Sequence, residues 1–114
     1  MNMTVEEKSF CFAIELVELY KCITHTEKEF IMSKQLLRSG TSIGANIAEA
    51  QQAQSRADFI SKLSIALKEA CETDYWLRLL HATDYINDAS FSSYINNCRE
   101  IEKMLTAIIK STKP

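Results

Sequence analysis

Three carboxylates, Glu49, Glu72 and Asp74, come closest to a set of side chains that could do chemistry together. Their positions fit two facing helices, where di-metal bundle proteins place a glutamate and Glu-x-x-His motifs. The histidine is missing, because Tyr75 stands three residues after Glu72, and Glu72 itself stands three residues after Glu69. We therefore expect no metal ion at these carboxylates.

The cysteines and histidines suggest no site either. The cysteines form no C-x-x-C pair, and no cysteine or histidine pair has metal-ligand spacing. In reducing cytosol such cysteines are mostly small core hydrophobes. No Ser/His/Asp or Cys/His arrangement is present, and the segment from Gly40 to Gly44 is not a phosphate loop. We expect no enzyme activity and no cofactor; the residues concerned are Cys11, Cys22, Cys71, Cys98, His25 and His81.

The basic residues are unevenly distributed along the chain. The net charge is −2, which argues against a general nucleic-acid binder. Residues 28–68, however, carry six basic residues against three acidic ones. This segment is either a nucleic-acid contact, reinforced by other copies in an oligomer, or an ordinary solvated face. The candidate contacts are Lys34, Arg38, Arg56 and Lys62.

Composition indicates which elements must position these side chains. A chain of 114 residues is expected to form a single domain over residues 1–114. One proline and two glycines leave little material for turns, which disfavours an all-β fold and favours long helices. The first residues, MNMTVEEKSF, do not resemble a signal peptide, and no window holds 18 apolar residues. We expect a cytoplasmic protein without membrane contact.

Capping patterns mark where the helices begin. A Thr or Ser followed three residues later by an acidic residue satisfies the free N–H groups of a first helical turn. Three such pairs occur, and a fourth start is expected at Asn87 or Asp88. The sequence predicts four helices, at about residues 5–23, 27–53, 56–82 and 89–111. The three pairs are Thr4 with Glu7, Thr26 with Glu29, and Ser55 with Asp58.

Small residues dominate positions 39–48, which include both glycines of the chain. A glycine in an exposed helix costs about 1 kcal/mol relative to alanine, so a helix here needs the close approach of a second helix. The alternative is a turn at the sequence SGTS between two shorter helices. Asn46 and Glu49 lie between apolar neighbours, and we expect partial burial in preference to a solvated edge. The close-packing residues are Gly40, Ile43, Gly44 and Ile47.

Two predicted helices carry apolar faces that are wider than one bundle core needs. On the first helix the apolar arc covers about 220°, against the roughly 100° that a surface helix buries. The third helix carries an additional patch at Trp76 and Leu79. The excess predicts contact with another subunit, although burial under loops is an alternative. The candidate subunit contacts are Phe12, Leu16, Leu19, Ile23 and Trp76.

The segment SGTSIGANIAEAQQAQSRADFISKLSIALKEACETDYWLRLL, residues 39–80, resembles a family of bacterial four-helix-bundle proteins encoded by intervening sequences in large-subunit (23S) rRNA genes. The matching features are Ser42-Ile43, Asn46-Ile47-Ala48-Glu49, Asp58-Phe59, Ala66, Glu72 and Leu77. One departure is Lys68-Glu69, where many members have Gly-Ser.

This resemblance implies an all-α, antiparallel up-down four-helix bundle that assembles into a homopentameric barrel. It also implies a kinship with accessory proteins of diversity-generating retroelements, which bind nucleic acid and a reverse transcriptase. We expect a non-enzymatic oligomer that acts as a nucleic-acid-binding or accessory scaffold protein. The alternative is a protein–protein interaction module without a nucleic-acid role. The expected partners are other copies of the chain, RNA or DNA, and a reverse transcriptase or other protein.

Overall fold

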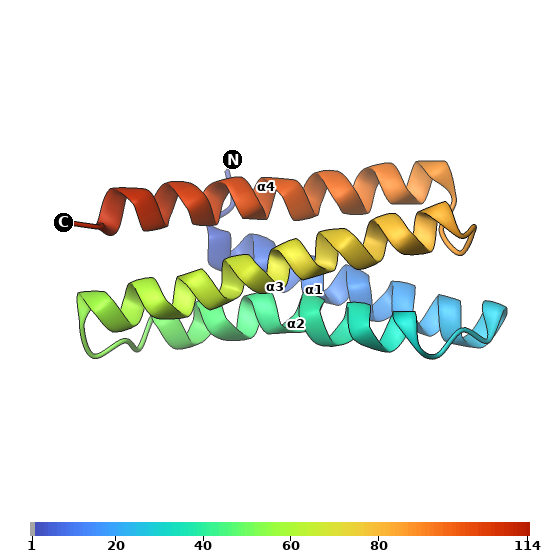
Figure 1. Cartoon of the computed structure of the whole chain (residues 1–114), viewed down its shortest axis with the longest axis horizontal. Helices are drawn as coiled ribbons and strands as arrows, with labels where there is room; N and C mark the ends of the chain where they lie inside the picture. Colours follow the sequence, from blue (N-terminus) through green and yellow to red (C-terminus); the bar gives the residue numbers. More distant parts are fainter. Residues whose placement is uncertain (1) are drawn as a thin grey trace.

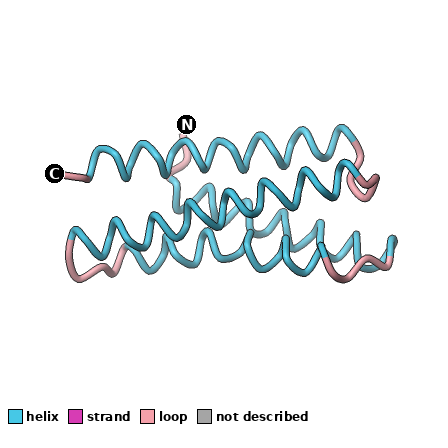
Figure 2. The backbone as a smooth tube through the Cα atoms, in the orientation of Figure 1, coloured by secondary structure: helices cyan, strands magenta, loops and turns pink. Residues whose placement is uncertain are grey.

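Four α-helices make up almost the whole computed structural model, which describes residues 2–114 (Figure 1). They are α1 (Val5–Cys22), α2 (Met32–Ala50), α3 (Arg56–Ala82) and α4 (Asp88–Thr112), and a five-residue π-helix, η1 (Ile23–Glu27), extends α1. Residues 2–114 contain no strand, so the all-α prediction is confirmed. Short loops join successive helices at alternating ends of a body of 46 × 25 × 22 Å (Figure 2).

Three of the four predicted helix starts carry the expected cap. At α1 the N–H of Glu7 donates to Thr4 Oγ1 over 3.1 Å, and the Thr4 N–H donates to the Glu7 carboxylate over 2.9 Å. At α3 the Asp58 N–H donates to Ser55 Oγ over 3.0 Å. At α4 Asn87 Oδ1 accepts from the N–H of Ser90. These caps satisfy N–H groups that a first turn leaves without a partner.

The start of the second helix differs from the prediction. Thr26 does not cap a helix but lies within η1, and Lys28 turns the chain with a left-handed φ of 56°. The carboxylate of Glu29 then accepts hydrogen bonds from the N–H groups of Ile31, Met32 and Ser33 over 2.8–3.0 Å. The predicted pair of Thr26 with Glu29 is therefore wrong, because Glu29 alone performs the capping.

The small-residue segment is one continuous helix, so the alternative of a turn at SGTS is wrong. A Cβ built on Gly40 would lie 2.1 Å from Leu16 Cδ1 of α1. A Cβ on Gly44 would lie 3.4 Å from Ser9 Oγ and 3.6 Å from the Ser9 carbonyl oxygen. The glycines thus lie where α2 packs closely against α1, while Ile43, on the same helix, is fully buried.

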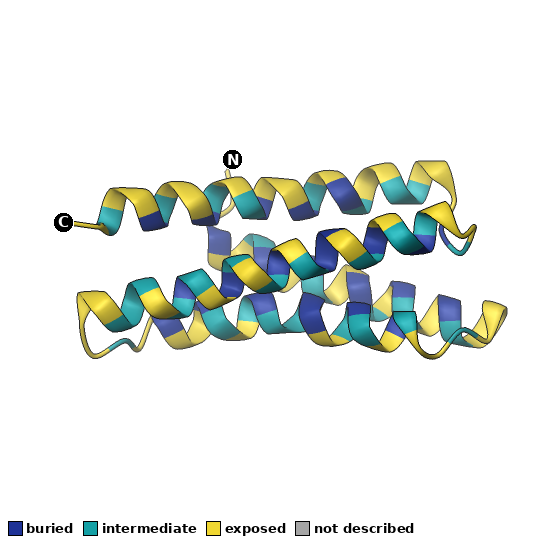
Figure 3. Ribbon diagram, viewed as in Figure 1, coloured by how far each residue is buried: buried dark blue, intermediate teal, exposed yellow. Residues whose placement is uncertain are grey.

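Packing is uneven around the bundle. α2 packs extensively on both α1 and α3, and α3 packs on α4, whereas the α1–α4 seam is the least extensive of the four. Buried positions face the centre along all four helices (Figure 3). Ile47 completes the buried stripe of α2, Asn46 is half-buried, and Glu49 is exposed. The expected burial of Glu49 is wrong, because the helix turns this position toward solvent.

Candidate functional site

The structure divides the four predicted nucleic-acid contacts instead of gathering them. The guanidinium group of Arg38 forms ion pairs with Glu69, over 3.1 Å, and with Glu72. Lys62 Nζ lies 3.2 Å from a carboxylate oxygen of Glu49. Carboxylates of α2 and α3 therefore offset two of the four positive charges. Sequence analysis had grouped Glu49, Glu72 and Asp74. In the structure Glu49 pairs with Lys62 and Glu72 pairs with Arg38, so these two carboxylates belong to different ion pairs.

The other two basic candidates lie at opposite ends of the molecule. Lys34 belongs to the first turn of α2, whereas Arg56 begins α3 at the far end of α2. With a rise of about 1.5 Å per residue, the helix between them is roughly 25 Å long. Within residues 2–114 neither side chain forms an ion pair, and both are exposed. The four residues do not form one basic patch on a single chain.

The predicted subunit contacts on α1 are occupied by the core of the chain itself. Phe12, Leu16, Leu19 and Ile23 are all at least nine-tenths buried, so they have almost no surface left for another subunit. Trp76 is half-buried, and its Nε1–H donates to Glu72 over 3.0 Å. A subunit contact on α1 must therefore use other residues.

Large apolar side chains remain exposed on the side of α1 that faces solvent. Phe10 is 68% exposed and Ile14 is 51% exposed, and their i, i+4 spacing places them on one face. A second exposed apolar pair, Phe30 and Ile31, lies in the segment between η1 and α2. The wide apolar arc of the first helix indicated that some of its apolar residues lie outside the core. Periodicity did not show that these residues are Phe10 and Ile14.

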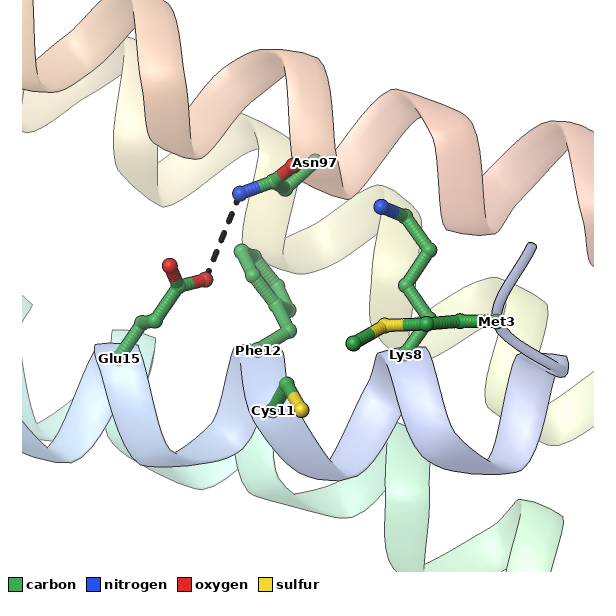
Figure 4. A pocket seen from close by; sticks show the side chains of 6 residues that line it. All are labelled: Met3, Lys8, Cys11, Phe12, Glu15 and Asn97. Carbon is green, nitrogen blue, oxygen red and sulfur yellow. Dashed lines mark hydrogen bonds between the residues drawn. The ribbon is translucent and has the colours of Figure 1, made fainter. Parts of the chain in front are cut away.

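The loosely packed α1–α4 seam holds a cavity of about 240 Å³ (Figure 4). Polar contacts bridge the seam: Asn97 Nδ2 donates to Glu15 over 3.4 Å, and Lys8 Nζ lies 3.1 Å from Glu100. The lining mixes charged, amide, thiol and apolar groups without a nucleophile–base pair. Its residues are Met3, Lys8, Cys11, Phe12, Glu15 and Asn97.

The neighbouring seam, between α3 and α4, gathers two cysteines and two carboxylates that we call the α3–α4 cluster: Cys71, Asp74, Cys98 and Glu102. Asp74 Oδ1 accepts from Arg78 Nε over 2.8 Å, and Oδ2 accepts from Arg99 Nε over 3.0 Å. The Cys98 thiol lies 3.6 Å from Glu102 Oε2 and 3.3 Å from the Ala70 carbonyl oxygen.

Burial and the contact between the two carboxyl groups set the protonation of this cluster. Burial, and after it the hydrogen bond and charge of Asp74, raises the pKa of Glu102 to about 7. Burial also raises the pKa of Asp74, but hydrogen bonds from Arg99, Glu102 and Arg78 outweigh it and hold that pKa below its ordinary value. Burial raises the pKa of the Cys98 and Cys71 thiols. Below pH 7 the pair thus holds a proton on Glu102 and a charge on Asp74, and Glu102 loses its proton as the pH rises through that value.

Sequence reasoning missed the α3–α4 cluster. It grouped Asp74 with Glu49 and Glu72, whereas Asp74 faces α4. The available signal was the spacing of its members, i, i+3 on the third helix and i, i+4 on the fourth, which puts each pair on one helix face. The cysteines were expected in the core, and this is wrong for Cys11, Cys22 and Cys71, which are exposed; Cys98 alone is buried.

Comparison with known proteins adds two findings. The family model described as 23S rRNA-intervening sequence protein matches residues 1–107. A solved structure of a protein with unknown function from the S23 ribosomal protein family of Bacteroides thetaiotaomicron is 61% identical, with a TM-score of 0.93. The match covers 94% of this chain and 99% of that one. No curated protein matches the chain. Within residues 2–114, no helix has the length and apolar character needed to cross a membrane.

Proposed function

Because the chain belongs to the 23S rRNA-intervening sequence protein family, we propose that it is a non-enzymatic helical scaffold that assembles into a homopentameric barrel. The observation that supports this proposal is the exposure of Phe10 and Ile14 on a helix whose opposite face already fills the core. Two large apolar side chains one turn apart gain free energy by leaving water, and another copy of the chain offers a matching helical surface.

A scaffold role requires no reactive side chain. Burial raises the pKa of the Cys98 thiol, so that without a bound metal ion it stays in the unreactive thiol form. The solved relative is itself described as a protein with unknown function, and no reaction is attached to it.

Light scattering coupled to size-exclusion chromatography tests the assembly. Five copies of the 13.0 kDa chain have a mass of about 65 kDa. We expect this mass for the natural chain, and a mass near 13.0 kDa for a variant with Phe10→Ser and Ile14→Ser. The matched control replaces the second exposed pair, with Phe30→Ser and Ile31→Ser, and should keep the larger mass. A natural chain that stays monomeric, or a control that dissociates as readily, contradicts the proposal.

A nucleic-acid role is the second candidate, and it depends on the assembly. Lys34 and Arg56 are exposed without ion pairs among residues 2–114, and a symmetric ring repeats each of them five times at one level. Repetition of weak contacts raises the overall affinity without any new contact in a single chain. If the resemblance to retroelement accessory proteins extends to function, a reverse transcriptase is a candidate protein partner. A reverse transcriptase gene beside the gene for this chain would favour a role like that of the retroelement accessory proteins. A position inside an rRNA gene would favour the intervening-sequence branch of the family.

Titration of labelled structured RNA and duplex DNA with the assembled protein tests this role. Phosphate contacts predict binding that weakens steeply between about 50 and 200 mM salt. Lys34→Gln with Arg56→Gln should reduce the affinity and the salt slope, whereas Lys110→Gln with Lys113→Gln, at the end of the chain, should not. An assembled protein that binds neither nucleic acid at low salt leaves the protein–protein interaction module as the better description.

A further inference from the structure

The α3–α4 cluster brings together four side chains for which a scaffold has no evident use. Asp74, Cys98 and Glu102 each offer one ligand atom, and these three atoms lie within 4.8 Å of one another. Cys71, one turn before Asp74 on α3, places its thiol 3.8 Å from Glu102 Oε1. We propose that this cluster binds one Zn²⁺ ion, with two thiolates and two carboxylates as ligands.

The types of donor atom select this metal. Thiolates favour zinc and other soft or borderline ions, whereas Mg²⁺ and Ca²⁺ take oxygen ligands almost exclusively. A tetrahedral site with Zn–S near 2.3 Å and Zn–O near 2.0 Å has sulfur–oxygen edges of about 3.5 Å. Cys98 Sγ lies 3.6 Å from Oε2 of Glu102, which is close to that edge, and Cys71 Sγ lies 3.8 Å from the other oxygen of the same carboxylate, Oε1. Three of the ligand atoms are already grouped, and rotation of the exposed Cys71 side chain has to bring its thiol to the same ion.

The surrounding charges balance such an ion. Four deprotonated ligands carry four negative charges, of which Zn²⁺ neutralises two. The guanidinium groups of Arg78 and Arg99, both hydrogen-bonded to Asp74, supply the remaining two positive charges. A carboxylate oxygen has two lone pairs, so Asp74 can bind the metal and keep an arginine partner, as ligating carboxylates commonly do.

The burial gradient across the cluster provides an entry path. Cys98 is 0% exposed and Asp74 is 8% exposed, while Glu102 is half-buried and Cys71 is exposed. An ion can therefore reach the buried ligands from the Cys71 side, and the Cys71 thiol then closes the site. The inner ligands lie on α3 and α4, which already pack against each other, so little of the chain has to be ordered on binding.

Metal titration of the full chain tests the proposal in a background with Cys11→Ser and Cys22→Ser, because those exposed thiols could bind zinc by themselves. The protein is first treated with a chelator, then titrated with Zn²⁺ by calorimetry and with Co²⁺ by absorption spectroscopy. We expect one ion per chain, a higher Tm with zinc, and a cobalt spectrum with a thiolate charge-transfer band and tetrahedral intensity.

Ligand variants in the same background locate the ion. Cys98→Ser and Glu102→Gln should each weaken zinc binding by at least about tenfold. Loss of a group that only hydrogen-bonds to a metal ligand already lowers metal affinity about 10–100-fold. Cys71→Ser should weaken it and reduce the charge-transfer intensity. If circular dichroism shows that Cys98→Ser does not fold, Glu102→Gln becomes the deciding variant, because Glu102 is only half-buried. No binding at micromolar zinc, undiminished binding by Glu102→Gln, or a cobalt spectrum without the thiolate band overturns the proposal.

Discussion

The two glycines of α2 should respond differently to the same substitution. Gly40 and Gly44 are one turn apart in one helix, so alanine relieves the same propensity cost, about 1 kcal/mol, at both. Their surroundings differ. A Cβ at Gly40 would lie 2.1 Å from Leu16 Cδ1, whereas the nearest atom to a Cβ at Gly44 is Ser9 Oγ at 3.4 Å, an ordinary contact.

These distances set the magnitudes. Gly44→Ala should raise the free energy of unfolding by up to about 1 kcal/mol, because the propensity gain meets no opposing clash. At Gly40 the new methyl group must displace Leu16, which is fully buried, and overpacking of this kind costs about 1–3 kcal/mol. Gly40→Ala should therefore be neutral to destabilising by about 2 kcal/mol, and the two variants should differ by about 1–3 kcal/mol.

Urea unfolding followed by circular dichroism and by the fluorescence of Trp76, the one tryptophan of the chain, measures both variants. The comparison is made at several protein concentrations, because assembly makes the apparent stability concentration-dependent. In the Gly40→Ala background, Leu16→Ala should cost less than it does alone, since it removes the overlapping atom. Equal stability of the two glycine variants, or additive behaviour of the Leu16 pair, would refute the close-contact argument.

Three further predictions concern caps, titration and packing. Glu29→Gln should destabilise the fold by about 1 kcal/mol, because the amide is a weaker acceptor for three N–H groups at the start of α2, whereas Glu27→Gln in η1 should change the urea midpoint little. Because the folded-state pKa of Glu102 is raised from 4.5 to about 7, stability should decline as pH rises through that interval in the presence of a chelator. Glu102→Gln should abolish the decline in the urea midpoint, and a decline that persists in this variant must come from other groups. Gly44→Leu should destabilise by at least about 1 kcal/mol, because a side chain beyond Cβ meets the backbone of Ser9; unchanged urea stability and mass would contradict this.

Local rules were sufficient for most of the secondary structure. The Thr4, Ser55 and Asn87 caps involve partners three residues away, so sequence spacing is the same as spatial proximity there. The same reasoning failed at Thr26, because η1 extends the first helix and Lys28 adopts a left-handed conformation before Glu29 caps α2. Thr26 and Glu29 both carry an acceptor that can cap a helix start, and spacing alone did not identify Glu29 as the cap of α2.

The sequence by itself determined the all-α class, the close contact at the two glycines and the family, because these depend on periodicity, on residue size and on a linear motif. Only the tertiary structure decided which charged side chains form ion pairs and which apolar side chains stay exposed outside the core. Arg38 meets Glu69 and Glu72 across 31 and 34 residues, and Asp74 meets Arg99 across 25. Such encounters depend on how two helices rotate about their own axes. No spacing within a single helix contains that rotation, so the sequence could not predict the ion pairs of Arg38 and Lys62 or the α3–α4 cluster.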